Sequence, residues 1–308
     1  MSAILITGGA GNIGSALADK LSKNPDNLIV IVDNLSTGSY YKVPKIGNVI
    51  LISADVNNYN DVVAIFGRYN FDYVFHYAAM VGVKRTLKHP MQVLHDIEGI
   101  KNILMLSKNT GVKRVFYSSS SEVYGEPFEI PQNELTTPLN SRLPYAIVKN
   151  VGEAFFRAYH QEYFLDYTIF RFFNTYGPNQ SDDFVVPRFL KAALKNQPIN
   201  IYGDGMQTRS FCYVDDNVDT CIKAMTDPNC KNDVLNVGSD QEITILDLAK
   251  KIISITQSKS EIIHLPPLEE GDMTRRCPDT TKMKALLNRP LISLETGLQQ
   301  LTAFYENR

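Results

Sequence analysis

The sequence Ile4-Leu5-Ile6-Thr7-Gly8-Gly9-Ala10-Gly11-Asn12-Ile13-Gly14 decides the fold, because an apolar, strand-like run leads straight into a glycine-rich loop. A helical pattern follows directly over Gly14–Ser22. Gly8, Gly11 and Gly14 are three residues apart. Glycines at such a position permit a tight turn and let backbone N–H groups approach a pyrophosphate at the positive end of a helix. The stretch therefore predicts a dinucleotide-binding strand, loop and helix.

Carboxylates close the next two predicted strands. Asp33 ends the second strand, 19 residues beyond Gly14, where a carboxylate can bind the adenosine ribose hydroxyls of NAD. No Arg or Lys lies between Asp33 and Tyr41 to hold a 2′-phosphate, so the pattern favours NAD over NADP. Asp55, at the end of the third strand, is a candidate adenine contact, and a simple strand-end turn accounts for it equally well.

Strand-like and helix-like segments alternate through the first half of the chain. The predicted strands are short and bounded by turn residues: Ile4–Thr7, Leu28–Asp33, Val49–Ala54, Tyr73–Tyr77, Arg114–Ser118 and Tyr167–Phe173. Helical spacing covers Gly14–Ser22, Asn60–Tyr69, Met91–Lys108 and Tyr145–Tyr163. This alternation requires a parallel sheet with helices on both faces. The expected fold class is therefore α/β, a doubly wound parallel sheet of the Rossmann type.

The pattern changes after about residue 174. The segments Asn174–Asp183 and Asn200–Gln207 are rich in Gly, Pro, Asn and Asp, and the elements become short and irregular. Ile245–Ile255 is a further predicted helix, and Leu265–Arg276 is a predicted polar loop. We expect a large domain at residues 1–173 and a smaller C-terminal α/β lobe at residues 174–308, some of whose segments return to the large domain.

The composition excludes several classes of protein. Of the 308 residues 44% are apolar, and 31 Lys and Arg against 33 Asp and Glu give a net charge of −2, which offers no general attraction to nucleic acid or to an anionic membrane. No apolar run approaches the ~20 residues that span a bilayer, and no secretory pattern opens the chain. The four cysteines have no paired spacing, which predicts reduced thiols and a cytoplasmic location: Cys212, Cys221, Cys230 and Cys277. The five histidines are scattered along the chain, which predicts no metal site: His76, His89, His95, His160 and His264.

A Tyr-x-x-x-Lys pair occurs at Tyr145 and Lys149, and residues four apart lie on one face of a helix. An ammonium group beside the phenol, with a nicotinamide cation nearby, stabilises phenolate and lowers the pKa of the tyrosine from ~10 toward neutrality. Tyr145 is then a candidate general base for a sugar or alcohol hydroxyl. A serine run ends an apolar strand 25 residues before it, and Ser120 in that run is a candidate hydrogen-bond partner for the substrate oxygen.

Taken together, these residues resemble the extended short-chain dehydrogenase/reductase family. The closer resemblance is to its nucleotide-sugar branch of UDP-glucose 4-epimerases, UDP-glucuronate decarboxylases and NDP-glucose 4,6-dehydratases, and it covers essentially the whole chain. The motifs that carry it, besides those above, are His76-Tyr77-Ala78-Ala79, Arg171-Phe172-Phe173-Asn174-Thr175-Tyr176-Gly177-Pro178, Tyr202–Phe211 and Val214-Asp215-Asp216.

The resemblance implies contacts for each ligand. NAD would meet Gly8, Gly11, Asn12, Ile13, Gly14, Asp33, Asn34, Asp55, Val56, Tyr77, Ala78, Ala79, Tyr145 and Lys149. A nucleotide-diphosphate sugar would meet Lys84, Asn174, Val186, Arg188, Tyr202, Arg209 and Arg276. The expected catalytic residues are Ser120, Tyr145, Lys149 and Glu122. In this scheme Tyr145 takes the proton of the sugar C4 hydroxyl, Ser120 holds that oxygen, and Lys149 binds the nicotinamide ribose.

Several outcomes are open after the 4-keto sugar forms. The sequence favours a 4-epimerase, because Ala78–Lys84 and Pro144-Tyr145-Ala146 resemble the epimerase versions of these segments. A net 4-dehydrogenase of a hexose or heptose would share every motif. A UDP-glucuronate decarboxylase would explain Ser120-Ser121-Glu122 and Arg276-Cys277-Pro278. A 4,6-dehydratase fits less well, since Ser121 stands where that branch has Asp. An NAD-sensing regulator would have a broken triad, and this chain has an intact one.

Two residues depart from the family pattern, and two helices suggest a partner. Asn12 replaces an aromatic residue often found in the glycine loop, and Asp96 stands where Asn is common. An aspartate cannot donate the hydrogen bond that an amide can, unless it is protonated. The long predicted helices Met91–Lys108 and Tyr145–Tyr163 commonly pair in the family as a four-helix bundle, so we expect at least a homodimer.

Overall fold

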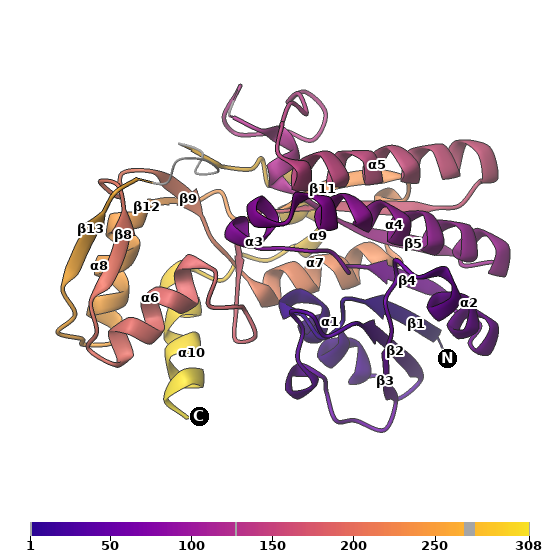
Figure 1. Cartoon of the computed structure of the whole chain (residues 1–308), viewed down its shortest axis with the longest axis horizontal. Helices are drawn as coiled ribbons and strands as arrows, with labels where there is room; N and C mark the ends of the chain where they lie inside the picture. Colours follow the sequence, from indigo (N-terminus) through magenta and orange to yellow (C-terminus); the bar gives the residue numbers. More distant parts are fainter. Residues whose placement is uncertain (1, 127, 268–274, 308) are drawn as a thin grey trace.

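A parallel sheet of seven strands forms the centre of the protein (Figure 1). The computed structural model describes residues 2–126, 128–267 and 275–307, without the side chains of Val83 and Lys84. The sheet has the order β11-β6-β5-β4-β1-β2-β3. Its strands are β1 (Ser2–Thr7), β2 (Asn27–Asp33), β3 (Val49–Ser53), β4 (Tyr73–His76), β5 (Arg114–Ser120), β6 (Tyr167–Phe172) and β11 (Asp233–Val237). The order turns back at β1, which pairs with both β2 and β4, so the crevice for a ligand is expected there.

Helices cover both faces of this sheet because side chains of a strand alternate between its faces. Ile4 and Ile6 share one buried cluster with residues of α1 (Asn12–Ser22), α7 (Val214–Thr226) and α9 (Thr281–Leu287). Leu5 belongs to the opposite cluster, with residues of α2 (Tyr59–Arg68), α4 (Pro90–Thr110) and α5 (Pro144–Tyr163). Burial on both sides accounts for strands that are apolar throughout rather than alternating.

A smaller lobe lies at one end of the sheet (Figure 1). It pairs β8 (Ile199–Tyr202) with β13 (Ile262–Leu265), and β9 (Thr208–Ser210) with β12 (Glu242–Thr244). A third buried cluster joins these strands to α6 (Val185–Leu194), α8 (Ile245–Ile255) and α10 (Leu294–Glu306). At the junction with the large domain, β7 (Thr175–Tyr176) pairs with β10 (Cys212–Tyr213). Helix α3 (Val83–Lys88) stands on the large-domain side of this junction.

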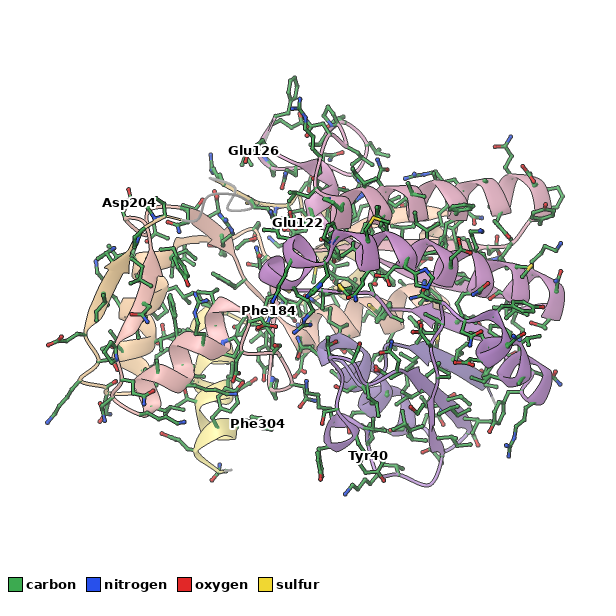
Figure 2. All side chains as sticks on the ribbon, in the orientation of Figure 1. Tyr40, Glu122, Glu126, Phe184, Asp204 and Phe304 are labelled. Atoms are coloured by element: carbon green, nitrogen blue, oxygen red, sulfur yellow. The ribbon has the colours of Figure 1, made fainter. Side chains whose placement is uncertain are left out.

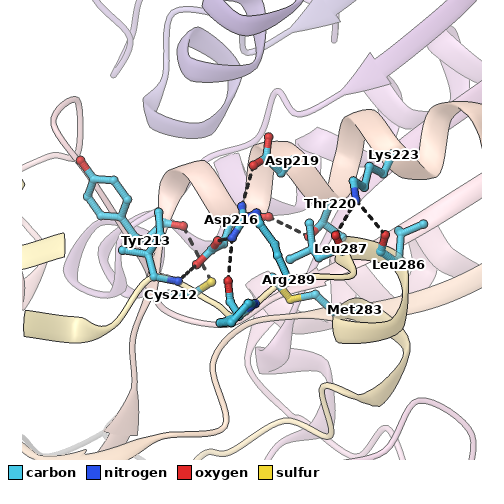
Figure 3. Close-up of polar contacts among 12 residues, drawn as sticks. Cys212, Tyr213, Asp216, Asp219, Thr220, Lys223, Met283, Leu286, Leu287 and Arg289 are labelled. Atoms are coloured by element: carbon cyan, nitrogen blue, oxygen red, sulfur yellow. Dashed lines mark hydrogen bonds and ion pairs between the residues drawn. The ribbon is translucent and has the colours of Figure 1, made fainter. Parts of the chain in front are cut away.

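Arg289 fixes the C-terminal segment to α7 (Figure 3). Its Nη1 donates to Asp216 Oδ1 at 2.5 Å and its Nη2 donates to Asp219 Oδ2 at 2.6 Å. The other oxygen of Asp216 accepts the backbone N–H of Ile292 at 2.8 Å. The side chain of Asp216 is fully buried, so these charge-assisted bonds compensate a carboxylate that would otherwise be costly to bury. The linker between α9 and α10 is thereby held in place.

The predicted α/β fold class is confirmed. Every strand and helix expected in the first half is present, with ends that differ by a few residues, and α8 has the predicted bounds. Residues after 174 contribute to both parts of the molecule, since β11 extends the main sheet beside β6 and α7 covers it. Most of the predicted loop Leu265–Arg276 lies outside the described residues, and Leu265 itself ends β13.

Candidate active site

One cavity of about 1010 Å³ follows the carboxyl ends of the sheet strands. Its walls include the glycine loop after β1, Asp33 after β2, Asp55 after β3, and residues 77–82 after β4. Ser118–Ser120 at the end of β5 continue the same wall, and residues 179–181 and 183–186 face it. In Figure 2, Glu122 of the large domain and Phe184 of the lobe lie near this junction, whereas Tyr40, Asp204 and Phe304 lie at the periphery.

The glycine loop has no room for larger residues. Gly8 has φ +68°, and a Cβ on it would lie 2.6 Å from the backbone nitrogen of Ala78. A Cβ on Gly14 would lie 2.5 Å from the carbonyl oxygen of Gly8. Helix α1 then begins at Asn12, and no side chain caps its first N–H groups. Those N–H groups and the helix dipole form an anion site that suits a pyrophosphate.

Asp33 stabilises the loop as well as lining the cavity. Its Oδ2 accepts the N–H of Ala10 at 2.9 Å and its Oδ1 accepts the N–H of Leu35 at 2.8 Å. Asn34 and Asp55 lie beside it, and Asn34 Nδ2 donates to Asp55 Oδ2 at 3.2 Å. The carboxylate is thereby fixed in the cavity wall, and its contact with ribose hydroxyls stays a prediction.

Other residues that were predicted to contact NAD also line the cavity, and so does Lys42, which was not predicted. Ile13, Val56, Tyr77, Ala78 and Ala79 all line the cavity. The buried Oδ1 of Asn12 has no hydrogen-bond partner among the described residues, so the glycine loop also presents an unused acceptor. Lys42 lines the same cavity, near enough to Asp33 for the two charges to interact, while burial lowers the pKa of its ammonium. Lys42 directly follows the segment from Asp33 to Tyr41, which contains no cation.

Ser120 and Tyr145 meet at the other end of the cavity. A hydrogen bond from Ser120 favours the phenolate of Tyr145, and the nearby Arg276 acts in the same direction. Burial nevertheless raises the pKa of Tyr145, and the carboxylates of Glu122 and Asp96 raise it further. In the chain alone, loss of hydration outweighs the favourable contacts, and the lower pKa expected for Tyr145 beside a nicotinamide cation stays a prediction.

Lys149 lies one helical turn from Tyr145 and is 3% exposed. Its Nζ donates to the carbonyl oxygen of Ser118 at 2.6 Å and lies 5.0 Å from the ring centre of Tyr117 and 5.8 Å from that of Tyr145. Burial lowers the pKa of Lys149 to about 8, and Asp96 opposes this shift. The ammonium is thus held by a carbonyl and by aromatic faces rather than by a direct bond to the phenol oxygen.

An ion pair joins Glu122 to Arg276 beside the tyrosine. Glu122 belongs to a short 3₁₀ turn (Ser121–Tyr124) that follows β5, and Arg276 comes from near the C-terminal end of the chain. The guanidinium Nη1 donates to Glu122 Oε1 at 2.9 Å and to the hydroxyl of Ser121 at 3.4 Å. The second oxygen of Glu122, Oε2, is buried and accepts no hydrogen bond from the described residues. The carboxylate therefore retains an acceptor beside Tyr145.

A buried network of hydrogen bonds and an ion pair packs against the residues around Tyr145. Ser119 donates to Glu153 Oε1 at 2.6 Å, and Arg171 forms two bonds to the same carboxylate, at 2.8 and 2.7 Å. Arg171 also donates to the hydroxyl of Tyr124 at 2.8 Å. Since Ser119 precedes Ser120 and Tyr124 closes the turn that carries Glu122, the network fixes two catalytic candidates. Glu153 is not among the site residues that were predicted from the sequence.

The predicted substrate residues divide into two groups. Asn174, Val186 and Arg276 line the cavity. Arg188, Tyr202 and Arg209 do not: Arg188 packs over the ring of Tyr202, 5.7 Å from its centre, and Arg209 Nη1 donates to the carbonyl of the preceding Thr208 at 2.7 Å. These three residues lie within the lobe and outside the lining of this cavity, and their contact with a nucleotide sugar stays a prediction. The side chain of Lys84 lies outside the described part.

Other kinds of site receive no support from the described residues. Within residues 2–126, 128–267 and 275–307 no three His, Cys, Asp or Glu side chains are grouped to hold a metal ion. In the same ranges no helix is both long enough and apolar enough to cross a membrane. All four cysteines are buried free thiols.

The fold and this site define a class of enzyme, and comparison with known proteins agrees. The model of the NAD-dependent epimerase/dehydratase family matches residues 4–238, and the chain belongs to this family, part of the extended short-chain dehydrogenases/reductases. It is 37% identical to UDP-N-acetyl-α-D-glucosaminuronate decarboxylase of Bacillus cytotoxicus, over 98% of this chain and 97% of the relative. It is 34% identical to a putative UDP-glucose 4-epimerase of Methanocaldococcus jannaschii, over 99% and 98%. The structure of UDP-glucose 4-epimerase from Thermotoga maritima superposes with a TM-score of 0.93, 33% identity and 99% coverage of both chains.

Proposed function

We propose that this protein binds NAD and a nucleotide-diphosphate sugar and oxidises the sugar C4 hydroxyl to a ketone. The observation that carries the proposal is that Ser120, Tyr145 and Lys149 line the same cavity as the glycine loop. Tyr145 accepts the hydroxyl proton, the Ser120 hydroxyl holds the reacting oxygen, and the Lys149 ammonium stabilises the phenolate that Tyr145 must become. When bound, NAD supplies the acceptor for the hydrogen and electron pair of the C4–H bond.

The Glu122–Arg276 pair supports decarboxylation of a 4-keto uronate as the second step. A carboxylate at C6 of the sugar is β to the new ketone, so the C5–C6 electron pair can pass into the carbonyl as carbon dioxide leaves. The guanidinium of Arg276 is the group in this corner that can orient such a carboxylate. One oxygen of Glu122 accepts no hydrogen bond from the described residues, so this carboxyl group can hold and pass on the proton that C5 then takes up. The decarboxylase named among the relatives supports loss of carbon dioxide from a uronate as the net reaction.

Epimerisation at C4 is the second candidate, and it is the one that the sequence favours. It requires the ketone to turn over and to regain hydrogen on its opposite face, which needs no acid or base beyond Tyr145. The epimerases named among the relatives and solved structures support it. A net 4-dehydrogenase is the same chemistry stopped at the ketone.

One experiment separates these reactions. The purified protein with NAD is given UDP-glucose, UDP-N-acetylglucosamine, UDP-glucuronate, UDP-N-acetylglucosaminuronate and NDP-heptoses in parallel, and product mass and NADH absorbance are recorded. Loss of carbon dioxide from a uronate supports decarboxylation, and unchanged mass with a new isomer supports epimerisation. Loss of two hydrogens with lasting NADH supports a net dehydrogenase. Failure of every sugar to reduce NAD or change would contradict the proposal.

We also propose where the substrate binds, how the chain assembles and where it acts. Residues 174–308 would supply most contacts to the nucleotide.

Helices α4 and α5 would pair with those of a second copy, because they expose apolar side chains: Met91 is 76% exposed, Tyr163 47% and Ile147 41%. A monomer by light scattering at micromolar concentration would contradict the dimer. A cytoplasmic location fits four reduced thiols.

A further inference from the structure

An ion pair in the cavity lining joins Arg85, on α3, to Asp183, which lies just before α6. Arg85 Nη2 donates to Asp183 Oδ2 at 2.8 Å. The two side chains remain 33% and 46% exposed, so a molecule that enters the cavity can reach both of them. Phe184, the next residue after Asp183, marks the place in Figure 2. The pair is therefore a charged contact that an incoming ligand meets directly.

Local structure fixes the guanidinium of Arg85 in the cavity wall. Gly82, with φ +102°, turns the chain into α3, and its carbonyl oxygen accepts the N–H of Thr86 at 2.9 Å. Arg85 Nη1 donates to the carbonyl oxygen of Val81 at 3.2 Å. A guanidinium carries more N–H donors than its two hydrogen bonds to the described residues use. Donors therefore remain for a ligand.

Asp183 places a negative charge where an anionic substrate would pass. Its Oδ2 also accepts the hydroxyl of Ser181 at 3.1 Å. The preceding Asp182 pairs instead with Lys191 of α6, at 2.5 Å, and neither of these two residues lines the cavity. A nucleotide-diphosphate sugar is anionic, so a carboxylate without a counter-charge in this lining would repel it. Arg85 supplies that counter-charge.

We propose that Arg85 binds an anionic oxygen of the nucleotide sugar, and that Asp183 holds the guanidinium until the substrate displaces it. This inference rests on the proposed function and adds to it a substrate-binding residue from α3. A guanidinium binds carboxylate and phosphate oxygens with the same fork of donors, so a substrate oxygen can replace that of Asp183. Exposed ion pairs are weak, so opening this one costs the substrate little.

The two partners of the pair should then have opposite effects on substrate binding. Arg85→Gln removes the charge that holds the substrate, and the Kd of the nucleotide sugar should rise about 10- to 100-fold. Asp183→Asn removes the competing carboxylate, and the Kd should fall by up to about fivefold. Arg85→Lys keeps the charge and should recover part of the affinity. A pair that only held the cavity walls together would be broken by either change, and the Kd would move in the same direction in both variants.

Calorimetry on the intact protein measures binding separately from turnover. The protein is loaded with NADH, which cannot accept hydrogen from the sugar, and is titrated with UDP-glucose, UDP-glucuronate and dTDP-glucose. Asp182→Asn is the matched control, because it breaks a neighbouring ion pair outside the cavity lining and should leave the Kd unchanged. Equal losses of affinity for UDP-glucose and UDP-glucuronate in Arg85→Gln identify a phosphate oxygen as the partner of Arg85. A loss confined to UDP-glucuronate identifies the sugar carboxylate.

Each result decides one question. Binding that Arg85→Gln does not weaken, or that Asp183→Asn does not tighten, overturns the inference, even if the sugar panel confirms C4 oxidation. Opposite shifts in Kd without a reaction on the panel uphold the substrate contact and remove the proposed oxidation. Failure of all three sugars to bind the wild type overturns both. If Arg85→Gln does not fold, Asp183→Asn decides alone, because a lower Kd supports the exchange and an equal or higher Kd overturns it.

Discussion

The two ends of the cavity are lined by different kinds of chemical group. The end near Asp33 is made largely by backbone: a glycine-rich loop, the open N-terminus of α1 and a carboxylate that accepts two backbone N–H groups. The end near Tyr145 is made by charged side chains, of which Lys149 and Arg276 are each at most 5% exposed. Backbone donors keep their character at any pH, whereas buried charges depend on their partners. The first end suits tight binding of a constant ligand, and the second suits proton transfer.

The largest effect is expected from removing the acid–base group of the charged end. Tyr145→Phe deletes only the hydroxyl, so kcat should fall about 10²- to 10⁴-fold while NAD binding persists. The measurement is product formation on the reactive sugar at several pH values. Tyr159→Phe is the control, because Tyr159 lies on the same helix and does not line the cavity. Turnover that survives in Tyr145→Phe would remove this residue from the mechanism.

Breaking the network behind the charged end should cost stability rather than chemistry. Glu153→Gln leaves Arg171 buried without its counter-charge, which typically destabilises a protein by about 3–5 kcal/mol. Chemical denaturation at neutral pH measures this loss, and Glu295→Gln, at an exposed pair with Lys251, is the control.

The same network predicts a pH dependence. Contacts with Arg171 and Ser119 hold the pKa of Glu153 below its usual value. Its stabilisation is therefore fully present above the unfolded carboxyl pKa and is lost as the pH falls through the folded value. The stability gap between the wild type and Glu153→Gln should shrink in acid, and a gap that widens there would contradict the assignment.

At the backbone end the sensitive property is conformation. Gly8→Ala introduces a Cβ at a positive φ and against the backbone of Ala78, at a cost of about 1–3 kcal/mol. If the loop must keep this shape to hold the cofactor, NAD affinity falls about 5- to 150-fold, as measured by calorimetry. Gly47→Ala, at a position with open space around it, should leave affinity unchanged.

The smallest effect is expected where the two parts of the molecule touch across the cavity. Arg85 Nη2 donates to Asp183 Oδ2 at 2.8 Å, and both side chains remain about one-third to one-half exposed, 33% and 46%. Exposed pairs contribute about 0–1 kcal/mol. Arg85→Ala should therefore speed NADH release by no more than about fivefold in stopped-flow fluorescence. A larger change would mean that this contact closes the cavity.

The sequence was informative where function depends on local spacing. The glycine loop, Asp33 and the Tyr145–Lys149 pair are each defined by a few neighbouring positions, and all of them line the cavity. Lys42 lies beyond the strand end and reaches the cavity through the fold of the loop after β2, which local spacing does not indicate. Glu153 could not be identified, because its partners Ser119 and Arg171 become neighbours only through the sheet. The lobe was the part least predictable from the sequence, because the positions of Arg188 and Arg209 depend on packing between elements that no motif indicates.

The separation between Glu122 and Arg276 also has a consequence for synthesis of the chain. These residues are 154 positions apart, and β11, which closes the sheet beside β6, is made late as well. A ribosome therefore completes the glycine loop and the helix of Tyr145 well before Arg276 leaves the exit tunnel. Until then Glu122 has no guanidinium partner, so the catalytic corner is the last part of the cavity to be finished.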